Sequence, residues 1–196
     1  DANGELNLSG TGITDVEGLA AFTSILKLDV SGNGITDLSP LTGSSFGIVA
    51  KSTGKTKIIQ KTTTMALQTL IVSNNNFDVL DVSSLSNLTT VDVSNNSALI
   101  TLNMQNGNNA SITSFDATNT PNLSCILVDD VNASYLSTWV KDTKSEFVAS
   151  EADCRAKVLS IDGFDISGKI SLYPNPVNTK LQIEVLNQLE IKNIKV

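Results

Sequence analysis

Short apolar–x–apolar triplets recur along the first two thirds of the chain, and each is followed by a turn rich in Gly and Asn. Residues 5–16 read ELNLSGTGITDV and residues 27–38 read KLDVSGNGITDL, an offset of 22 positions. In a strand, alternate side chains point to opposite faces, so the two apolar residues of a triplet share one side. The pattern predicts a repeated short strand with its aliphatic side chains turned inward.

From residue 67 onward a second triplet appears midway through each repeat. A single repeat cannot bury its own apolar edge, but strands stacked about 4.8 Å apart would share one aliphatic column and pair as a parallel sheet. Alternate triplets would then line two faces of a flattened coil, with Leu28, Leu70 and Val91 in register. The triplets of this region are Leu70/Val72, Leu80/Val82, Val91/Val93, Leu102/Met104, Phe115/Ala117 and Ile126/Val128.

An asparagine stands three residues after the second apolar position in several repeats, at Asn33, Asn75 and Asn96. A buried amide at this place can satisfy the backbone groups of the turn. The repeat is broken at two places: Thr11 stands where Asn is expected, and residues 107–109 are an insertion.

These positions resemble the leucine-rich repeat, L-x-x-L-x-L-x-x-N-x-L, and the first two units look like the 22-residue bacterial type of internalin-like proteins. The resemblance implies a mainly β solenoid with a parallel sheet over residues 1–131. Such repeats usually present a surface to a partner.

The repeat fails over residues 43–66, which contain Lys51, Lys55, Lys57 and Lys61. Two interpretations remain open. Either this stretch is a degenerate coil, or it is a basic hairpin inserted at the side of the solenoid.

A C-terminal cap is expected over residues 132–154, as a short helix with Asn132 as its N-cap and with Tyr135, Leu136 and Trp139 at helical spacing. The two cysteines, Cys125 and Cys154, are either buried thiols or a disulfide. We assign them to a disulfide that ties the cap to the last repeat, which requires an oxidising compartment.

Residues 155–168 are expected to be a linker, and residues 169–196 resemble the start of the C-terminal sorting domain of type IX secretion substrates. That resemblance implies a small β-sandwich, which would not be complete at Val196. It also implies export to the cell surface or beyond, across the periplasm, with the translocon, an outer-membrane β-barrel shuttle and a sortase-like peptidase as partners. The residues that carry it are Leu172, Tyr173, Pro174, Asn175, Pro176, Leu181 and Ile183.

The composition argues against several kinds of chemistry. The chain has no His, so Ser-His-Asp and Cys-His catalysis are excluded, and its two Cys form no CxxC pair for zinc. No phosphate-cradling glycine motif occurs. The net charge of −7 would repel a phosphate backbone. We therefore expect no enzymatic activity, no metal or cofactor, and no nucleic-acid partner.

The middle residue of each triplet points outward and is a candidate for binding. One interpretation is a polar ladder for a glycan, a cation or a basic protein. The other is that each Asp accepts hydrogen bonds from the turn that follows it. The candidates are Asn7, Asp29, Ile71 and Asp92 in one series, and Asp81, Asn103, Asp116 and Leu127 in the other.

Three functions are consistent with these features. The chain is an exported interaction module that binds a protein or glycan, or it is the binding appendage of a larger exported enzyme whose catalytic domain lies upstream, or it is a structural spacer. The lack of an N-terminal cap on the solenoid favours a preceding segment and thus the second alternative.

Overall fold

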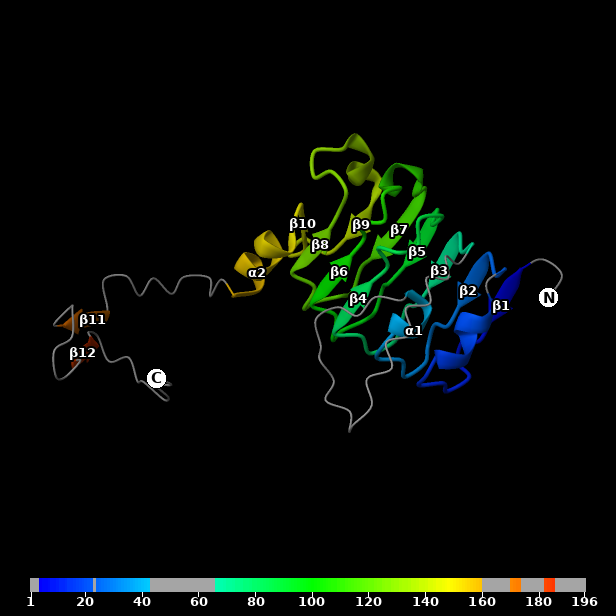
Figure 1. Cartoon of the computed structure of the whole chain (residues 1–196), viewed down its shortest axis with the longest axis horizontal. Coiled ribbons are helices and arrows are strands. Elements are labelled where there is room, and N and C mark those ends of the chain that lie inside the picture. The colour runs from blue at the N-terminus through cyan, green and yellow to red at the C-terminus, as the bar shows by residue number, and fades with distance from the viewer. Residues whose placement is uncertain (1–3, 23, 43–65, 160–169, 174–181, 186–196) are drawn as a thin grey trace. The chain divides into compact units, whose positions relative to one another are not determined.

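The computed structural model describes residues 4–22, 24–42, 66–159, 170–173 and 182–185. The chain divides into two units, residues 1–159 and residues 160–196. The first unit is built from two parallel sheets (Figure 1). The mainly β architecture with parallel strands is therefore confirmed. In the described residues, no helix has the length and apolar character needed to cross a membrane.

Strands that follow one another in sequence alternate between the two sheets from β3 onward. The six-stranded sheet has the order β1 (Glu5–Asn7), β2 (Lys27–Asp29), β3 (Thr69–Ile71), β5 (Thr90–Asp92), β7 (Ser114–Ala117) and β9 (Val140–Lys141). The four-stranded sheet has the order β10 (Glu146–Val148), β8 (Cys125–Leu127), β6 (Thr101–Asn103) and β4 (Val79–Asp81).

The expected register of the aliphatic column is observed. Leu28 pairs with Leu70, and Leu70 pairs with Val91, on neighbouring strands of the six-stranded sheet. Each of these side chains is at most 1% exposed. Burying an aliphatic side chain of this size stabilises the fold by roughly 1.5–3 kcal/mol, so the column is a main source of stability.

Strands β2 and β3 are direct neighbours although 42 positions separate Leu28 from Leu70. This pairing excludes a degenerate coil that would add a strand between them in the six-stranded sheet. Residues 43–65 themselves lie outside the described residues. In the first two repeats, the second strand is replaced by the 3-10 helix η1 (Glu17–Ala21) and the helix α1 (Ser39–Thr42), which contact each other.

The recurrent asparagines form a ladder that joins neighbouring repeats. Asn96 Nδ2 donates to the carbonyl of Val93 at 2.8 Å in its own repeat and to the carbonyl of Val72 at 3.1 Å in the preceding one. Its Oδ1 accepts the backbone N–H of Asn75 at 3.0 Å. Asn75 and Asn33 repeat this arrangement one repeat further toward the N-terminus each time. The prediction that these amides satisfy the turns is confirmed.

Threonine replaces asparagine at both ends of this ladder. The hydroxyl of Thr11 donates to the carbonyl of Leu8, and that of Thr120 donates to the carbonyl of Ala117, both at 2.7 Å. A hydroxyl reaches the carbonyl three residues before it, as the amide does, but it is too short to reach the preceding repeat. Thr11 therefore makes the hydrogen bond within its own turn but not the hydrogen bonds between repeats that the asparagines make.

The turn after each of β1, β2, β3, β5 and β7 in the six-stranded sheet contains one residue in the left-handed region. Only Gly and Asn tolerate this conformation at low cost, because other side chains place Cβ too close to the backbone. The five residues are Gly10, Gly32, Asn74, Asn95 and Asn119, with φ between 55° and 63°.

The C-terminal end of the first unit differs from the predicted cap. Asn132 is not an N-cap: its backbone N–H donates to Asp130 Oδ1, and the helix that follows is the 3-10 helix η3 (Ser134–Thr138), which begins after Ala133. Strands β9 and β10 then extend both sheets. Residues 132–148 therefore form one more repeat, because their apolar side chains continue the column between the sheets.

A regular helix, α2 (Glu151–Leu159), closes this end of the first unit. Ser150 caps it, since Ser150 Oγ accepts the N–H of Asp153 and donates to Asp153 Oδ2. The helix continues to residue 159, although a linker was expected from Arg155 onward. A further 3-10 helix, η2 (Asn109–Ser111), contains the end of the insertion over residues 107–109.

The second unit contains one described antiparallel pair, β11 (Ile170–Tyr173) with β12 (Gln182–Val185). Leu172 pairs with Ile183 in this hairpin. Of the residues singled out in the sorting motif, Pro174, Asn175, Pro176 and Leu181 lie outside the described residues.

Candidate binding surface

One continuous row of side chains lies across the outer face of the six-stranded sheet. Neighbouring strands pair these residues one to one, so the row is in register from β1 to β9. In order it runs Asn7, Asp29, Ile71, Asp92, Asp116 and Val140, and we call it the outer row.

Asp116 was assigned to the other series, and that assignment was wrong. Asp116 pairs with Asp92, so it belongs to the six-stranded sheet. Triplets alternate strictly between the sheets, and β7 follows β6 of the other sheet. The insertion before Asp116 lengthens the connection through η2 without changing this alternation.

The two remaining polar candidates, Asp81 and Asn103, lie on the four-stranded sheet, where they pair with each other. The next residue in that line is Leu127, which is 1% exposed and lies in a small apolar cluster with Cys154 of α2. The eight binding candidates therefore lie on two separate faces, and the six-stranded sheet brings five of them into one line.

The polar candidates share one local hydrogen bond. In each, Oδ1 accepts the backbone N–H of the residue two positions later, at 2.9–3.0 Å. This is the turn-supporting role expected for Asp in these triplets. The residues are Asn7, Asp29, Asp81, Asp92, Asn103 and Asp116.

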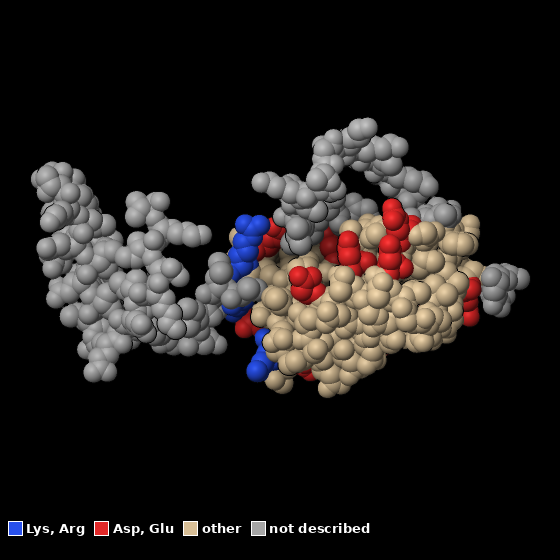
Figure 2. All heavy atoms as spheres, turned by 90° about the horizontal axis from the view of Figure 1, so that it is seen from below, with Lys and Arg blue, Asp and Glu red and all other residues tan. Residues whose placement is uncertain are grey.

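The outer row is accessible and strongly acidic. Asp29, Ile71, Asp92 and Asp116 are half-buried, and Asn7 is exposed. Within the described residues, the segments 28–42 and 66–140 contain no Lys or Arg, whereas the cations after them gather at the C-terminal end. In the face seen in Figure 2, Asp and Glu lie mainly in the upper half of the body as drawn, and Lys and Arg gather at one end. A negative potential over the body follows from this distribution.

A second outward row flanks the first and was not singled out from the sequence. It runs through the position two residues earlier in each strand, where Glu5 pairs with Lys27 at 3.8 Å as an ion pair. Past Lys27 the row carries only hydroxyls, from Thr69, Thr90 and Ser114. The strand alternation that identified the first row also identifies this one.

The adjacent carboxylates of Asp129 and Asp130 both accept hydrogen bonds from backbone N–H groups. Asp129 accepts the N–H of Gly107 and of Asn109 at 3.1 Å each, and Asp130 accepts the N–H of Asn132.

Burial, together with the charges of Asp129 and Asp130, raises the pKa of Tyr135. In the part of the chain that the structure describes, no group of three or more potential metal ligands occurs.

The repeated strands, left-handed turns and asparagine ladder are the features of leucine-rich repeats, and a family match over the first 96 residues supports this class. Residues 1–96 match a family model described as the leucine-rich repeat domain of the endo-β-N-acetylglucosaminidase EndoS. The matched segment ends at Asn96, the last asparagine of the ladder. A comparison with curated proteins finds no significant match.

Proposed function

We propose that this chain is an exported interaction module, a leucine-rich-repeat solenoid that binds a protein or glycan through the outer face of its six-stranded sheet. The observation that carries the proposal is the outer row, in which five of the eight candidate residues lie in register on accessible strands. The four-stranded sheet is less suited to this role, because its outer row becomes apolar and buried at Leu127.

The acidic outer row and the neighbouring hydroxyls offer hydrogen-bond acceptors and donors on one face of the sheet. In each Asp of the row, Oδ1 supports the turn, whereas Oδ2 of Asp29 accepts a long hydrogen bond, 3.5 Å, from Asn7 Nδ2 of the neighbouring strand. The charge of these side chains can therefore be separated from their structural role. Asn supplies the same Oδ1 acceptor without the charge, as Asn7 and Asn103 already do in this chain.

The test is a screen of the full chain against glycans and cell-surface proteins, followed by a charge variant carrying Asp29→Asn, Asp92→Asn and Asp116→Asn. We expect at least about tenfold weaker binding of the partner found, equivalent to about 1.4 kcal/mol. The matched control is Asp81→Asn on the other sheet, which should bind within about twofold of wild type. Equal losses in both variants, or the absence of any binder, would contradict the proposed surface.

We further propose that the second unit directs export by the type IX route to the cell surface or the medium. The LYPNP motif and the hairpin that pairs Leu172 with Ile183 support this proposal. The partners would be the translocon, its outer-membrane β-barrel shuttle and a sortase-like peptidase. A periplasmic reporter that carries the complete sorting segment should reach the cell surface, and retention in the periplasm would count against the proposal.

An alternative function is the binding appendage of a larger exported enzyme. It is supported by the family match, since the matching leucine-rich repeat domain is named after an endo-β-N-acetylglucosaminidase. The first two repeats also have the 22-residue offset of the bacterial, internalin-like type. The complete reading frame distinguishes the two proposals, because a catalytic domain encoded before Asp1 favours the appendage.

A further inference from the structure

A small apolar cluster lies apart from the main core, on the outer face of the four-stranded sheet. It consists of Cys125 and Leu127 of β8, Val148 of β10 and Cys154 of α2. All four side chains are at most 6% exposed. Leu127 and Val148 pair across neighbouring strands, so together they form an apolar patch that α2 covers.

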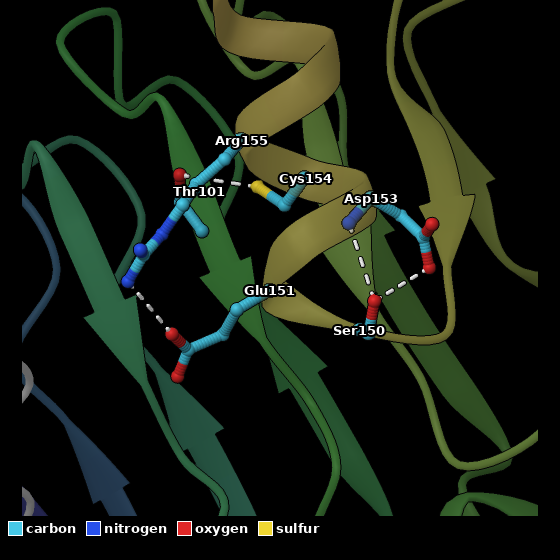
Figure 3. A network of polar contacts seen from close by, with 6 residues as sticks. All are labelled: Thr101, Ser150, Glu151, Asp153, Cys154 and Arg155. Atoms are coloured by element: carbon cyan, nitrogen blue, oxygen red, sulfur yellow. Dashed lines mark hydrogen bonds and ion pairs between the residues drawn. The ribbon is translucent and has the colours of Figure 1, made fainter.

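The disulfide between Cys125 and Cys154 joins α2 to this patch, with a Cα–Cα distance of 5.5 Å. Figure 3 shows Cys154 pointing from the helix toward Thr101 of the neighbouring strand β6. The Thr101 hydroxyl lies 3.7 Å from Cys154 Sγ and 3.9 Å from Cys125 Sγ. The two sulfur atoms therefore lie where α2 packs against the outer face of the four-stranded sheet.

The other described contacts of α2 are polar and near solvent. Among its side chains that the structure describes, Cys154 alone is buried. The Arg155–Glu151 pair at 3.2 Å lies within the helix, and the Lys157–Glu146 pair at 2.5 Å links it to β10 with both partners about half exposed. Exposed ion pairs contribute little, and a helix of nine residues is marginal in water without packing.

We propose that α2 is a redox-released cover of the four-stranded sheet, held closed by the Cys125–Cys154 bond. A dithiol reductant opens it by transferring two electrons and two protons. The S–S bond breaks, Cys125 and Cys154 become thiols, and the reductant becomes a disulfide. Release of α2 uncovers Leu127 and Val148, which extend the outward line that begins with Asp81 and Asn103.

The two sheets do not depend on this bond. The residues of the main core between the sheets are separate from the outer cluster. Strand β10 is also held by its pairing with β8 and by Gln105, whose Nε2 donates to the carbonyls of Val128 at 3.1 Å and Ala149 at 2.9 Å. Reduction should therefore free the helix and leave the strands in place.

The test is hydrogen exchange measured by mass spectrometry on the full chain, before and after treatment with excess dithiothreitol without denaturant. Alkylation with iodoacetamide counts the thiols formed. We expect the amides of α2 to exchange at least about tenfold faster after reduction, with those of β4, β5 and β6 changed by less than about twofold. Cys154→Ser should reproduce the reduced state, whereas Lys157→Gln, with the disulfide intact, should keep α2 protected.

Three results would overturn the proposal. The first is a bond that resists the reductant in the folded protein. The second is unchanged protection of α2 although both thiols are alkylated, which would show that other contacts hold the helix. The third is loss of protection throughout both sheets, which would make the disulfide a general staple of the fold. None of these outcomes bears on binding at the six-stranded sheet, so the two proposals fail independently.

Discussion

The asparagine ladder gives the sharpest prediction about stability. Asn96 is fully buried, and its amide joins two repeats. Its Oδ1 accepts the N–H of Asn75, and its Nδ2 donates to the carbonyls of Val72 and Val93. We predict that Asn96→Ala leaves the N–H of Asn75 and the carbonyl of Val93 without this partner, whereas the carbonyl of Val72 keeps the hydrogen bond that Asn75 Nδ2 donates to it.

The magnitude follows from the groups that are left unpaired. A buried polar group that loses its partner costs about 1–3 kcal/mol, although water can enter and reduce the loss. One donor and one acceptor, together with the small cavity left by the amide, give an expected loss of about 3–5 kcal/mol. This is a large fraction of the stability of a domain of this size.

Asn96→Thr is the matched variant, because Thr120 occupies the same position of a later repeat. Its hydroxyl should keep the bond to the carbonyl three residues earlier, as Thr120 does with Ala117. It should lose the two bonds to the preceding repeat. We expect a loss between that of Asn96→Ala and zero, at about 1–3 kcal/mol.

Urea denaturation gives the free energy of unfolding of all three proteins. Trp139, the single tryptophan, is a suitable reporter because it is 6% exposed and stacks on Phe115 with ring centroids 4.3 Å apart. Its fluorescence should change when the sheets separate. A loss below about 1 kcal/mol for Asn96→Ala, or a larger loss for Asn96→Thr than for Asn96→Ala, would refute the role assigned to the ladder.

Three further predictions concern the turns and the ionisable groups. Asp92→Ala removes the acceptor of the Ser94 N–H and should lower the free energy of unfolding by about 1–2 kcal/mol, whereas Asp92→Asn should stay within about 0.5 kcal/mol. Asn74→Val forces a β-branched residue into a φ of 55° and should cost about 1–2 kcal/mol, whereas Asn74→Gly should be nearly neutral by the same urea assay. The raised pKa of Tyr135 favours its neutral form in the folded state, so its contribution is present below pH 10.0 and is lost as the pH rises through the folded pKa. Tyr135→Phe should therefore unfold less readily than wild type in alkaline thermal scans while matching it near neutral pH.

The repeat region was predictable because burial of the strand side chains and hydrogen bonding of the turns require particular residues at fixed positions of every repeat. Apolar–x–apolar triplets occur where a strand must bury two side chains, and the asparagine occurs where a turn leaves backbone groups to satisfy. Both sheets, the register of Leu28 with Leu70, and the turn-supporting role of Asp92 follow from these constraints. Each depends on local chemistry that recurs every repeat.

The last repeat was missed because its column is filled by aromatic residues. Trp139 and Phe147 pack edge to face, with ring centroids 5.9 Å apart, and Trp139 stacks on Phe115, whereas Leu28, Leu70 and Val91 fill the column in the earlier repeats. The spacing of Tyr135, Leu136 and Trp139 suggested a helix, but only a 3-10 turn forms before β9. A usable signal for α2 was present in the sequence, since Ser150 and Asp153 have the spacing of a capping box.

The choice between the two outer faces depends on tertiary packing. Nothing in the triplet pattern alone states that α2 covers β8 and β10. The clue was Leu127, an apolar residue at an outward position, which is explained by its contact with the cluster around Cys154. The triplets placed the candidates in two series, but the face that α2 covers could not be derived until that contact was known.

The measurement that tests the two-sheet arrangement most directly is the distance between outward side chains of chosen strands. Spin labels on cysteines introduced at Thr69 and Thr90, which pair on β3 and β5, should lie on adjacent strands about 5 Å apart at the backbone and show strong dipolar broadening. Labels at Val79 and Thr90, which are closer in sequence but belong to different sheets, should show little broadening. Strong broadening for Val79 with Thr90 and none for Thr69 with Thr90 would contradict the alternation of strands and the binding face built on it.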